Sequence, residues 1–151
     1  MKINKKISVL ERCAIDYRNK RFSNIGLTGS NYYYVICVCK NPGISQEDLA
    51  KRIYVNKSNV ARNLKTLQKD GFIYKEINET DKRINMIFPT NKALNVLPKI
   101  KEVISDWNNI ILKELDNDTI NNLEKILEVL VGNATEYFNK EYIEENNWWK
   151  K

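Results

Sequence analysis

The segment 57–70 carries a polar and basic face. Three of its apolar residues recur at helical spacing and are expected to point inward: Val60, Leu64 and Leu67. A period of 3.6 residues then turns five hydrogen-bonding side chains outward: Ser58, Arg62, Lys65, Thr66 and Lys69. Asn59 lies at the edge of this face, and Asn63 lies nearer the core. Asn can pair with adenine and Arg with guanine, and Lys binds phosphate. Because none of these residues is acidic, the pattern predicts a DNA-reading surface. The alternative is a solvated face, which usually mixes both charge signs.

A second basic cluster follows about a dozen residues later. Asp81, Lys82 and Arg83 end a polar connection between two short runs of strand-forming residues. An aspartate two residues before an arginine can hold the guanidinium by a charge-assisted hydrogen bond. A basic hairpin tip beside a recognition helix can reach the adjacent minor groove or its phosphates. An ordinary charged turn is the simpler alternative.

The elements that would position these clusters can be inferred from capping and turn residues. Ser45 with Asp48 predicts the start of a helix over 45–54, and Asn56 is a plausible N-cap for the next helix. After Gly71 the periodicity changes, and residues 72–77 and 83–88 are the only strand-like runs in the chain. Helix, short turn, helix and hairpin form a winged helix-turn-helix. The expected fold class is therefore mainly α with a small β-hairpin wing.

Further helices are expected on both sides of this unit. Residues 3–21, 30–40, the segment after Thr90 and the segment after 116–119 have helical periodicity. Three of these helices carry long apolar stripes: Ile3, Ile7, Leu10, Ala14 and Tyr17; Ala93, Leu97, Ile100, Ile104, Trp107 and Ile111; and Ile120, Leu123, Leu127, Leu130, Ala134 and Tyr137. One short winged lobe cannot cover all three stripes, so we expect a dimer. Intramolecular packing of the three helices is the alternative.

Composition narrows the function classes. The net charge is +6, with the basic excess in the first 90 residues and an acidic last third, which favours a polyanionic partner. The chain has no histidine, no Gly-rich phosphate loop and no clustered carboxylates, so we expect neither an enzyme nor a metal or other cofactor. No apolar run is long enough for a membrane span or a signal peptide, so we expect a cytoplasmic protein. Cys13, Cys37 and Cys39 are then expected to be reduced thiols in apolar surroundings.

Three motifs resemble the MarR family of transcriptional regulators. Asp81-x-Arg83 followed by Thr90 resembles the family's wing signature. LAKRIYVNKSNVARNLKTLQKDGFI (49–73) resembles its helix-turn-helix, and Gly26-Leu27-Thr28 resembles the entry to its second helix. The resemblance extends in element order over about residues 5–140, and its specific motifs lie in 45–90.

This resemblance implies a homodimer whose winged lobes bind a palindromic double-stranded DNA operator. It implies a repressor that a small phenolic or other ligand releases, with Arg83 in the minor groove and Asp81 as its support. The organisation is that of one MarR-like domain over 1–151, with the DNA-binding lobe at about 30–90 and the dimerisation helices at about 1–25 and 91–143. The DNA-binding residues are then expected to be Ser58, Asn59, Arg62, Asn63, Lys65, Lys69, Lys82 and Arg83.

Other interpretations stay open. Three aromatic residues on the flanking elements are candidates for a ligand pocket, although core packing explains each of them as well: Tyr17, Tyr33 and Trp107. Cys13 could make the chain an oxidant-sensing regulator if its thiol is accessible and its pKa is lowered. A winged helix that only contacts other proteins is a third interpretation, but an acidic or apolar outer face would suit that function better.

Overall fold

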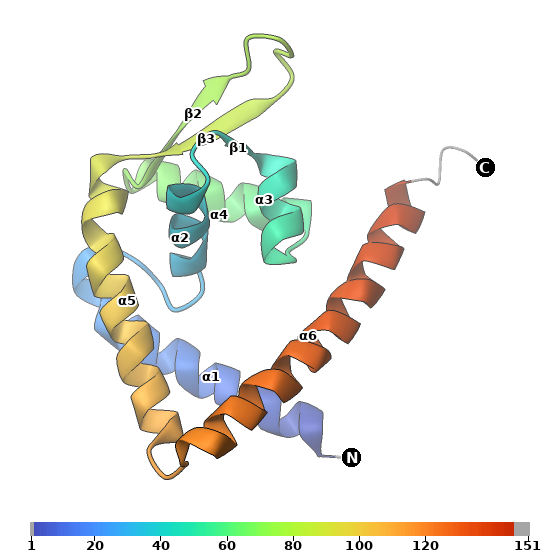
Figure 1. Cartoon of the computed structure of the whole chain (residues 1–151). Coiled ribbons are helices and arrows are strands. Elements are labelled where there is room, and N and C mark those ends of the chain that lie inside the picture. The colour runs from blue at the N-terminus through green and yellow to red at the C-terminus, as the bar shows by residue number, and fades with distance from the viewer. Residues whose placement is uncertain (1, 147–151) are drawn as a thin grey trace. The chain divides into compact units, whose positions relative to one another are not determined.

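The computed structural model describes residues 2–146, apart from the side chains of residues 138 and 140–146. The elements follow one another as α1 (Ile3–Phe22), η1 (Ser23–Ile25), α2 (Tyr32–Lys40), β1 (Ile44–Ser45), α3 (Gln46–Ile53), α4 (Lys57–Lys69), β2 (Ile73–Ile77), β3 (Asn85–Pro89), α5 (Asn91–Leu112) and α6 (Asn117–Asn146) (Figure 1). Contacts divide the chain into two units, Met1–Asn109 and Ile110–Lys151. The mainly helical fold with a small β-wing is confirmed.

The two helices of the helix-turn-helix begin where their caps predict. The Ser45 hydroxyl accepts a hydrogen bond from the Asp48 backbone N–H at 3.1 Å and donates to the Asp48 carboxylate at 2.9 Å. Asn56 caps α4 in the same way, because its Oδ1 accepts from the Asn59 backbone N–H at 2.9 Å. Each cap satisfies a backbone donor that has no partner within the helix. Gly71 follows α4 with a φ of 78°, a left-handed conformation that glycine adopts without steric cost.

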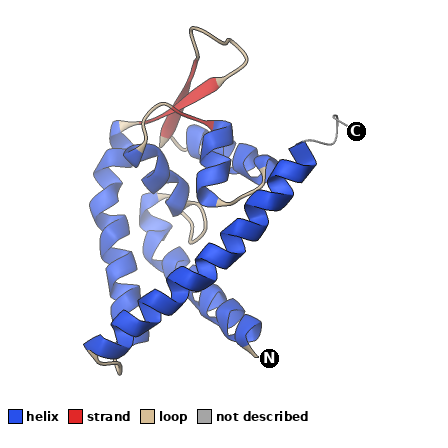
Figure 2. Ribbon diagram, turned by 45° about the vertical axis from the view of Figure 1, so that its right-hand side comes forward, coloured by secondary structure: helices blue, strands red, loops and turns tan. Residues whose placement is uncertain are grey.

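The wing belongs to a three-stranded antiparallel sheet in the order β1-β3-β2. Strands β2 and β3 form the hairpin, with Tyr74 opposite Phe88, and project from the helices of this unit (Figure 2). Ile44 of β1 pairs with Ile87 of β3. Our expectation of only two strands was therefore incomplete: a two-residue strand is too short to show an alternating pattern, and only its pairing with β3 reveals it.

The core of the first unit lies among α2, α3, α4 and the sheet. Its largest fully buried side chains come from seven elements or connections: Phe22, Val35, Val38, Leu49, Val60, Leu64, Leu67, Phe72, Ile87, Ile100 and Val103. The inner face predicted for α4 is confirmed, because Val60, Leu64 and Leu67 are each 0% exposed. This packing fixes the rotation of α4 about its own axis and so determines which side chains face solvent.

Helix α1 is fastened to the loop before α2 by polar contacts that the sequence pattern did not predict. The Gly29 backbone N–H donates to Asn19 Oδ1 at 2.7 Å, and its carbonyl accepts from Arg18 Nε at 2.9 Å. A Cβ at Gly29 would lie 2.4 Å from the backbone oxygen of Ile15, so this approach requires glycine. Arg18 is only 8% exposed, and its charge is balanced by Glu11 at 2.9 Å.

Thr90 connects the wing to α5. Its hydroxyl donates to the Gly71 carbonyl at 2.6 Å, and its backbone N–H donates to the Phe72 carbonyl at 3.0 Å. Close by, Lys92 Nζ donates to the Asp70 carbonyl at 2.7 Å. The end of α4, the base of the wing and the start of α5 are therefore held together by hydrogen bonds.

The apolar stripes of the flanking helices are only partly covered. On α1 the stripe is exposed at Ile3, Ile7 and Leu10, and it becomes buried at Ala14. Helix α6, taken by itself, exposes Leu127, Leu130 and Tyr137. Within residues 2–146 we find no helix that combines the length and the apolar character of a membrane span.

The cysteines differ from one another, and one expectation was wrong. Cys37 is buried and Cys39 half-buried in α2, as expected. Cys13, however, is exposed rather than in apolar surroundings. The buried side of α1 at this level is formed by Ala14, and one residue along a helix turns the side chain by about 100°.

Candidate nucleic-acid interface

The outer face of α4 is arranged as its periodicity predicts. The five side chains expected to point outward, Ser58, Arg62, Lys65, Thr66 and Lys69, are all exposed. Asn59 and Asn63 are half-buried at the margin. Since the opposite side of the helix is fully buried, these seven side chains form a polar ridge that contains no carboxylate.

Several side chains of this face already make hydrogen bonds to one another. The Ser58 hydroxyl donates to Asn56 Oδ1 at 2.9 Å, and the Arg62 guanidinium donates to Asn59 Oδ1. Lys65 and Lys69 differ, because neither has an ion-pair or hydrogen-bond partner among the described side chains. The first half of α4 therefore presents oriented groups, and the second half presents free positive charge.

Asn63 connects α4 to the core, a role that sequence reasoning missed. Its Nδ2 donates to the Asn59 backbone carbonyl at 2.9 Å. Burial raises the pKa of the Tyr34 phenol above its ordinary value, while a hydrogen bond with Asn63 opposes that rise. Tyr34 belongs to α2 and is almost fully buried, so Asn63 joins the recognition helix to its support.

The wing tip carries Arg83, whose side chain is oriented by hydrogen bonds to Asp81, two residues earlier. Arg83 Nε donates to Asp81 Oδ1 at 3.1 Å, and the terminal nitrogen donates to Asp81 Oδ2 at 3.2 Å. The Arg83 backbone N–H also donates to Asp81 Oδ1 at 3.1 Å. These hydrogen bonds lower the pKa of Asp81 below its ordinary value. The Arg83 side chain nevertheless remains 90% exposed, and neighbouring Lys82 is exposed as well.

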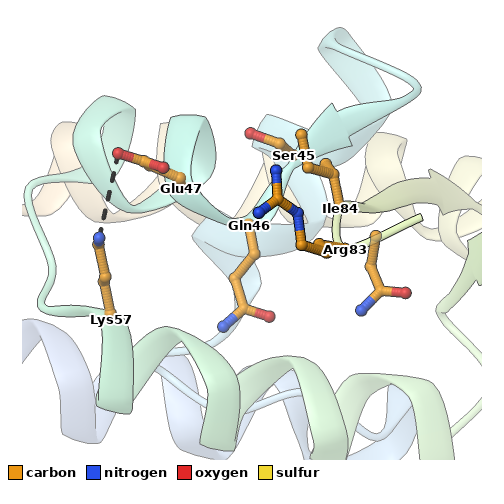
Figure 3. Close-up of a pocket in the computed structure, with 7 residues that line it drawn as sticks. Ser45, Gln46, Glu47, Lys57, Arg83 and Ile84 are labelled. Carbon is orange, nitrogen blue, oxygen red and sulfur yellow. Dashed lines mark ion pairs between the residues drawn. The ribbon is translucent and has the colours of Figure 1, made fainter. Parts of the chain in front are cut away.

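A cleft of about 390 Å³ lies between the helix-turn-helix and the wing. It is lined by Ser45, Gln46, Glu47, Lys57, Arg83, Ile84 and Asn85 (Figure 3). Glu47 reaches toward Lys57 at 4.0 Å and pairs with Lys51 at 3.2 Å. The lining residues come from three separate stretches of the chain, so no local pattern could have predicted that Gln46 and Asn85 share a site with Arg83.

The three aromatic residues expected at a ligand pocket are only partly brought together. The Tyr17 and Trp107 rings lie 5.3 Å apart, and Arg21 lies 5.7 Å from the Tyr17 ring while pairing with Asp106 at 2.7 Å. Tyr33 is 50% exposed on α2 and contacts Tyr32 edge-on at 6.2 Å. Within the part of the chain that the structure describes, no cluster of three or more metal-ligating side chains occurs.

Comparison with known proteins agrees with this geometry. The MarR family model matches residues 27–84. The HTH-type transcriptional regulator BilQ of Clostridioides difficile is 32% identical over 120 residues, which cover 80% of this chain and 76% of that protein. The crystal structure of the transcriptional regulator SlyA has a TM-score of 0.87 and 32% identity, covering 92% of this chain and 98% of that one.

A further similar structure is that of a MarR family transcriptional regulator from Listeria monocytogenes complexed with 26mer DNA. It has a TM-score of 0.85 and 27% identity, and the match covers 95% of this chain and 94% of that one. The reading-helix face, the aspartate-supported arginine at the wing tip and these similarities lead to one assignment: the chain belongs to the MarR family and is a DNA-binding transcriptional regulator, not an enzyme.

Proposed function

We propose that this regulator is a homodimeric repressor that binds a palindromic double-stranded DNA operator and is released by a small ligand. In this proposal α4 enters the major groove and the wing tip enters the adjacent minor groove. The DNA-contacting residues are Ser58, Asn59, Arg62, Asn63, Lys65, Lys69, Lys82 and Arg83, and Asp81 supports the last of these. Chromosomal DNA as the target would place the protein in the cytoplasm.

The observation that carries the proposal is the fixed but exposed Arg83. An ion pair in open solvent contributes little to the free energy of folding. The stability of the fold therefore does not account for the Asp81–Arg83 pair. The narrow minor groove concentrates negative potential and attracts arginine. A guanidinium already oriented by Asp81 would lose little conformational entropy on entering it.

The α4 face supports the same function through two kinds of contact. Asn59 and Arg62 carry donors and acceptors suited to base edges, and their mutual hydrogen bond presents them as a unit. Lys65 and Lys69 are free to neutralise phosphates. Phosphate contacts supply affinity and base contacts supply sequence preference.

Dimerisation is supported by the apolar side chains that one chain leaves exposed. Ile3, Ile7 and Leu10 on α1 and, separately, Leu127 and Leu130 on α6 lie open to solvent. Patches of this kind on a regulator indicate a protein interface. A two-fold dimer built from the dimerisation helices at about 1–25 and 91–143 would present the two winged lobes of about 30–90 to two half-sites.

An aromatic pair between α1 and α5 supports release by a small ligand. Tyr17 and Trp107, with Arg21 beside them, could accept a small aromatic ligand, and Tyr33, which contacts Tyr32, is the third aromatic candidate. Oxidant sensing is a second candidate, favoured by the exposure of Cys13. Burial raises the pKa values of Cys37 and Cys39, which disfavours the reactive thiolate at those positions.

One series of experiments tests the proposal. The full chain is used to select duplexes from random DNA, and its affinity for the selected duplex is compared with that for a scrambled duplex at constant salt. We expect a palindromic motif, a dimer in analytical ultracentrifugation at micromolar concentration, and weaker binding with a phenolic ligand. Equal affinity for both duplexes would contradict operator binding, and a monomer throughout the range would contradict the dimer. Release by peroxide in the wild type but not in Cys13→Ser would favour oxidant sensing.

A further inference from the structure

The cleft between the helix-turn-helix and the wing contains two side-chain amides that make no hydrogen bond within the described residues. Gln46 extends from α3 into the space that α3, the beginning of α4 and β3 enclose, and Arg83 enters it from the wing (Figure 3). Asn85 lines the same cleft from β3. Within residues 2–146, neither the Gln46 nor the Asn85 amide makes a hydrogen bond to another group. By contrast, Ser58, Arg62 and Asn63 on α4 all donate to neighbouring groups of α4 or its cap.

The position of the cleft indicates what it could hold. If α4 occupies the major groove and Arg83 the adjacent minor groove, one sugar-phosphate strand must pass between them, because a backbone strand separates the two grooves. The cleft lies between these two elements. Its volume of about 390 Å³ is much larger than the share of a water molecule, about 30 Å³.

The charges along the cleft also suit a phosphodiester. Lys57 and Arg83 contribute two positive charges to the lining, and Glu47 contributes one negative charge; Asp81, which is not part of the lining, pairs with Arg83 at 3.1 Å. Glu47 is compensated by Lys51 at 3.2 Å as well as by Lys57 at 4.0 Å. The lining is therefore net positive and offers the amide donors of Gln46 and Asn85 to an oxyanion.

We propose that this cleft binds one phosphodiester group of the DNA backbone, with Gln46 and Asn85 donating hydrogen bonds to it and Lys57 supplying charge. The inference rests on the proposed DNA-binding function and adds three residues to the interface, Gln46, Lys57 and Asn85. The cleft sets the spacing between the base-reading helix and the minor-groove arginine, because both must engage the same strand at a fixed distance from one phosphate.

Substitutions of Gln46 separate this role from a structural one. Gln46 is the first residue of α3, where a negative charge is favourable to the helix dipole. Gln46→Glu should therefore keep or raise the thermal midpoint while it weakens binding to the selected duplex by about tenfold or more, since it repels the phosphate. Gln46→Ala and Asn85→Ala should each weaken binding by about three- to tenfold, the effect of one lost hydrogen bond. Asn95→Ala, at an exposed asparagine of α5, is the matched control and should bind as the wild type.

Replacing single phosphates locates the contact. Each phosphate of the selected duplex is replaced in turn by an uncharged methylphosphonate, and the affinity of the wild type is compared with that of Gln46→Ala. We expect one phosphate in each half-site whose replacement makes the affinities of the wild type and of Gln46→Ala equal. Lys57→Ala should lower the slope of log affinity against log salt by about one, whereas Gln46→Ala should leave the slope unchanged.

The outcomes distinguish failure of this inference from failure of the proposed function. If the wild type selects no duplex, DNA binding itself is contradicted. If it binds its duplex and Gln46→Glu and Asn85→Ala bind equally well, the cleft is not a backbone site. Calorimetry with inorganic phosphate at constant ionic strength tests whether the cleft binds a free anion, and we expect no binding. Binding of free phosphate that Gln46→Ala abolishes, with DNA affinity unchanged, would overturn the DNA assignment and give the cleft to a small anion.

Discussion

The reading face of α4 and the tip of the wing present positive charge to solvent by different physical means. Helix α4 is held by burial, because Val60, Leu64 and Leu67 on its reverse side are fully covered. The wing tip has almost no core behind it: Ile77 is 64% exposed, and Arg83 is positioned by hydrogen bonds from Asp81 two residues away. The difference teaches that substitutions on the buried side of α4 should act through stability, whereas substitutions at the wing tip should act through binding alone.

The largest expected effect lies behind α4. Leu64→Ala removes a fully buried side chain, and large-to-small changes of this kind cost about 2–5 kcal/mol of unfolding free energy. Because the helix loses its support, DNA binding should weaken together with stability. Chemical denaturation followed by circular dichroism measures the loss. Thr66→Ala, on the exposed side of the same helix, is the control and should change the midpoint little.

Arg83→Ala tests the other half of the comparison. An exposed side chain contributes little to folding, so the thermal midpoint and the dimer should stay as in the wild type. Affinity for the selected duplex should fall by about 10- to 100-fold, the size of one well-placed arginine contact. Arg83→Lys should recover only part of this loss, because lysine keeps the charge but not the planar fork. A fall in stability that matches the fall in affinity would contradict the division between the two regions.

Within α4 the face itself should divide into base readers and phosphate contacts. Asn59→Ala and Arg62→Ala should change the sequence selected from random DNA, at about 1–3 kcal/mol for each lost base contact. Lys65→Ala and Lys69→Ala should weaken all sequences alike and lower the salt dependence. An unchanged motif in the first pair would show that the base-reading residues are wrongly assigned.

Asp81→Ala should have the smallest effect on DNA affinity, but the direction of the change distinguishes two explanations. Asp81→Ala removes a negative charge from the DNA-facing side, so simple electrostatics predicts tighter binding. If Asp81 orients Arg83, binding should weaken instead, by less than in Arg83→Ala. Fluorescence anisotropy at constant salt decides between the two, and tighter binding would make Asp81 an ordinary surface acid.

The pH dependence follows from the same pair. Arg83 lowers the pKa of Asp81 below its ordinary value of 3.8, so the carboxylate stays ionised when an unpaired aspartate would begin to protonate. The stabilising contribution of a group with a lowered pKa is present above the unfolded pKa and is lost as the pH falls through the folded pKa. The difference in affinity between the wild type and Asp81→Ala should therefore stay constant from pH 7 to about pH 5.

Much of this arrangement could be predicted because it depends on residues close together in the chain. The caps at Ser45 and Asn56 are contacts over three residues, and the Asp81–Arg83 pair spans two. The buried side of α4 follows from helical geometry and the order of its apolar residues. Local hydrogen bonds and periodicity therefore fixed the helix boundaries, the orientation of the reading face and the wing tip.

Contacts between distant segments were decided only by the tertiary structure. Strand β1 exists because Ile44 meets Ile87, and Arg18 is buried because Gly29 allows the loop before α2 to approach α1. The exposure of Cys13 depends on which side of α1 packs against the rest of its unit. The cleft joins Gln46 to Asn85 across nearly forty residues of chain. A sequence pattern shows how apolar and polar residues alternate over short distances, but it does not show which distant segments come into contact. The contacts between distant segments bring Ile44 to Ile87, Arg18 to Gly29 and Gln46 to the cleft that Asn85 also lines.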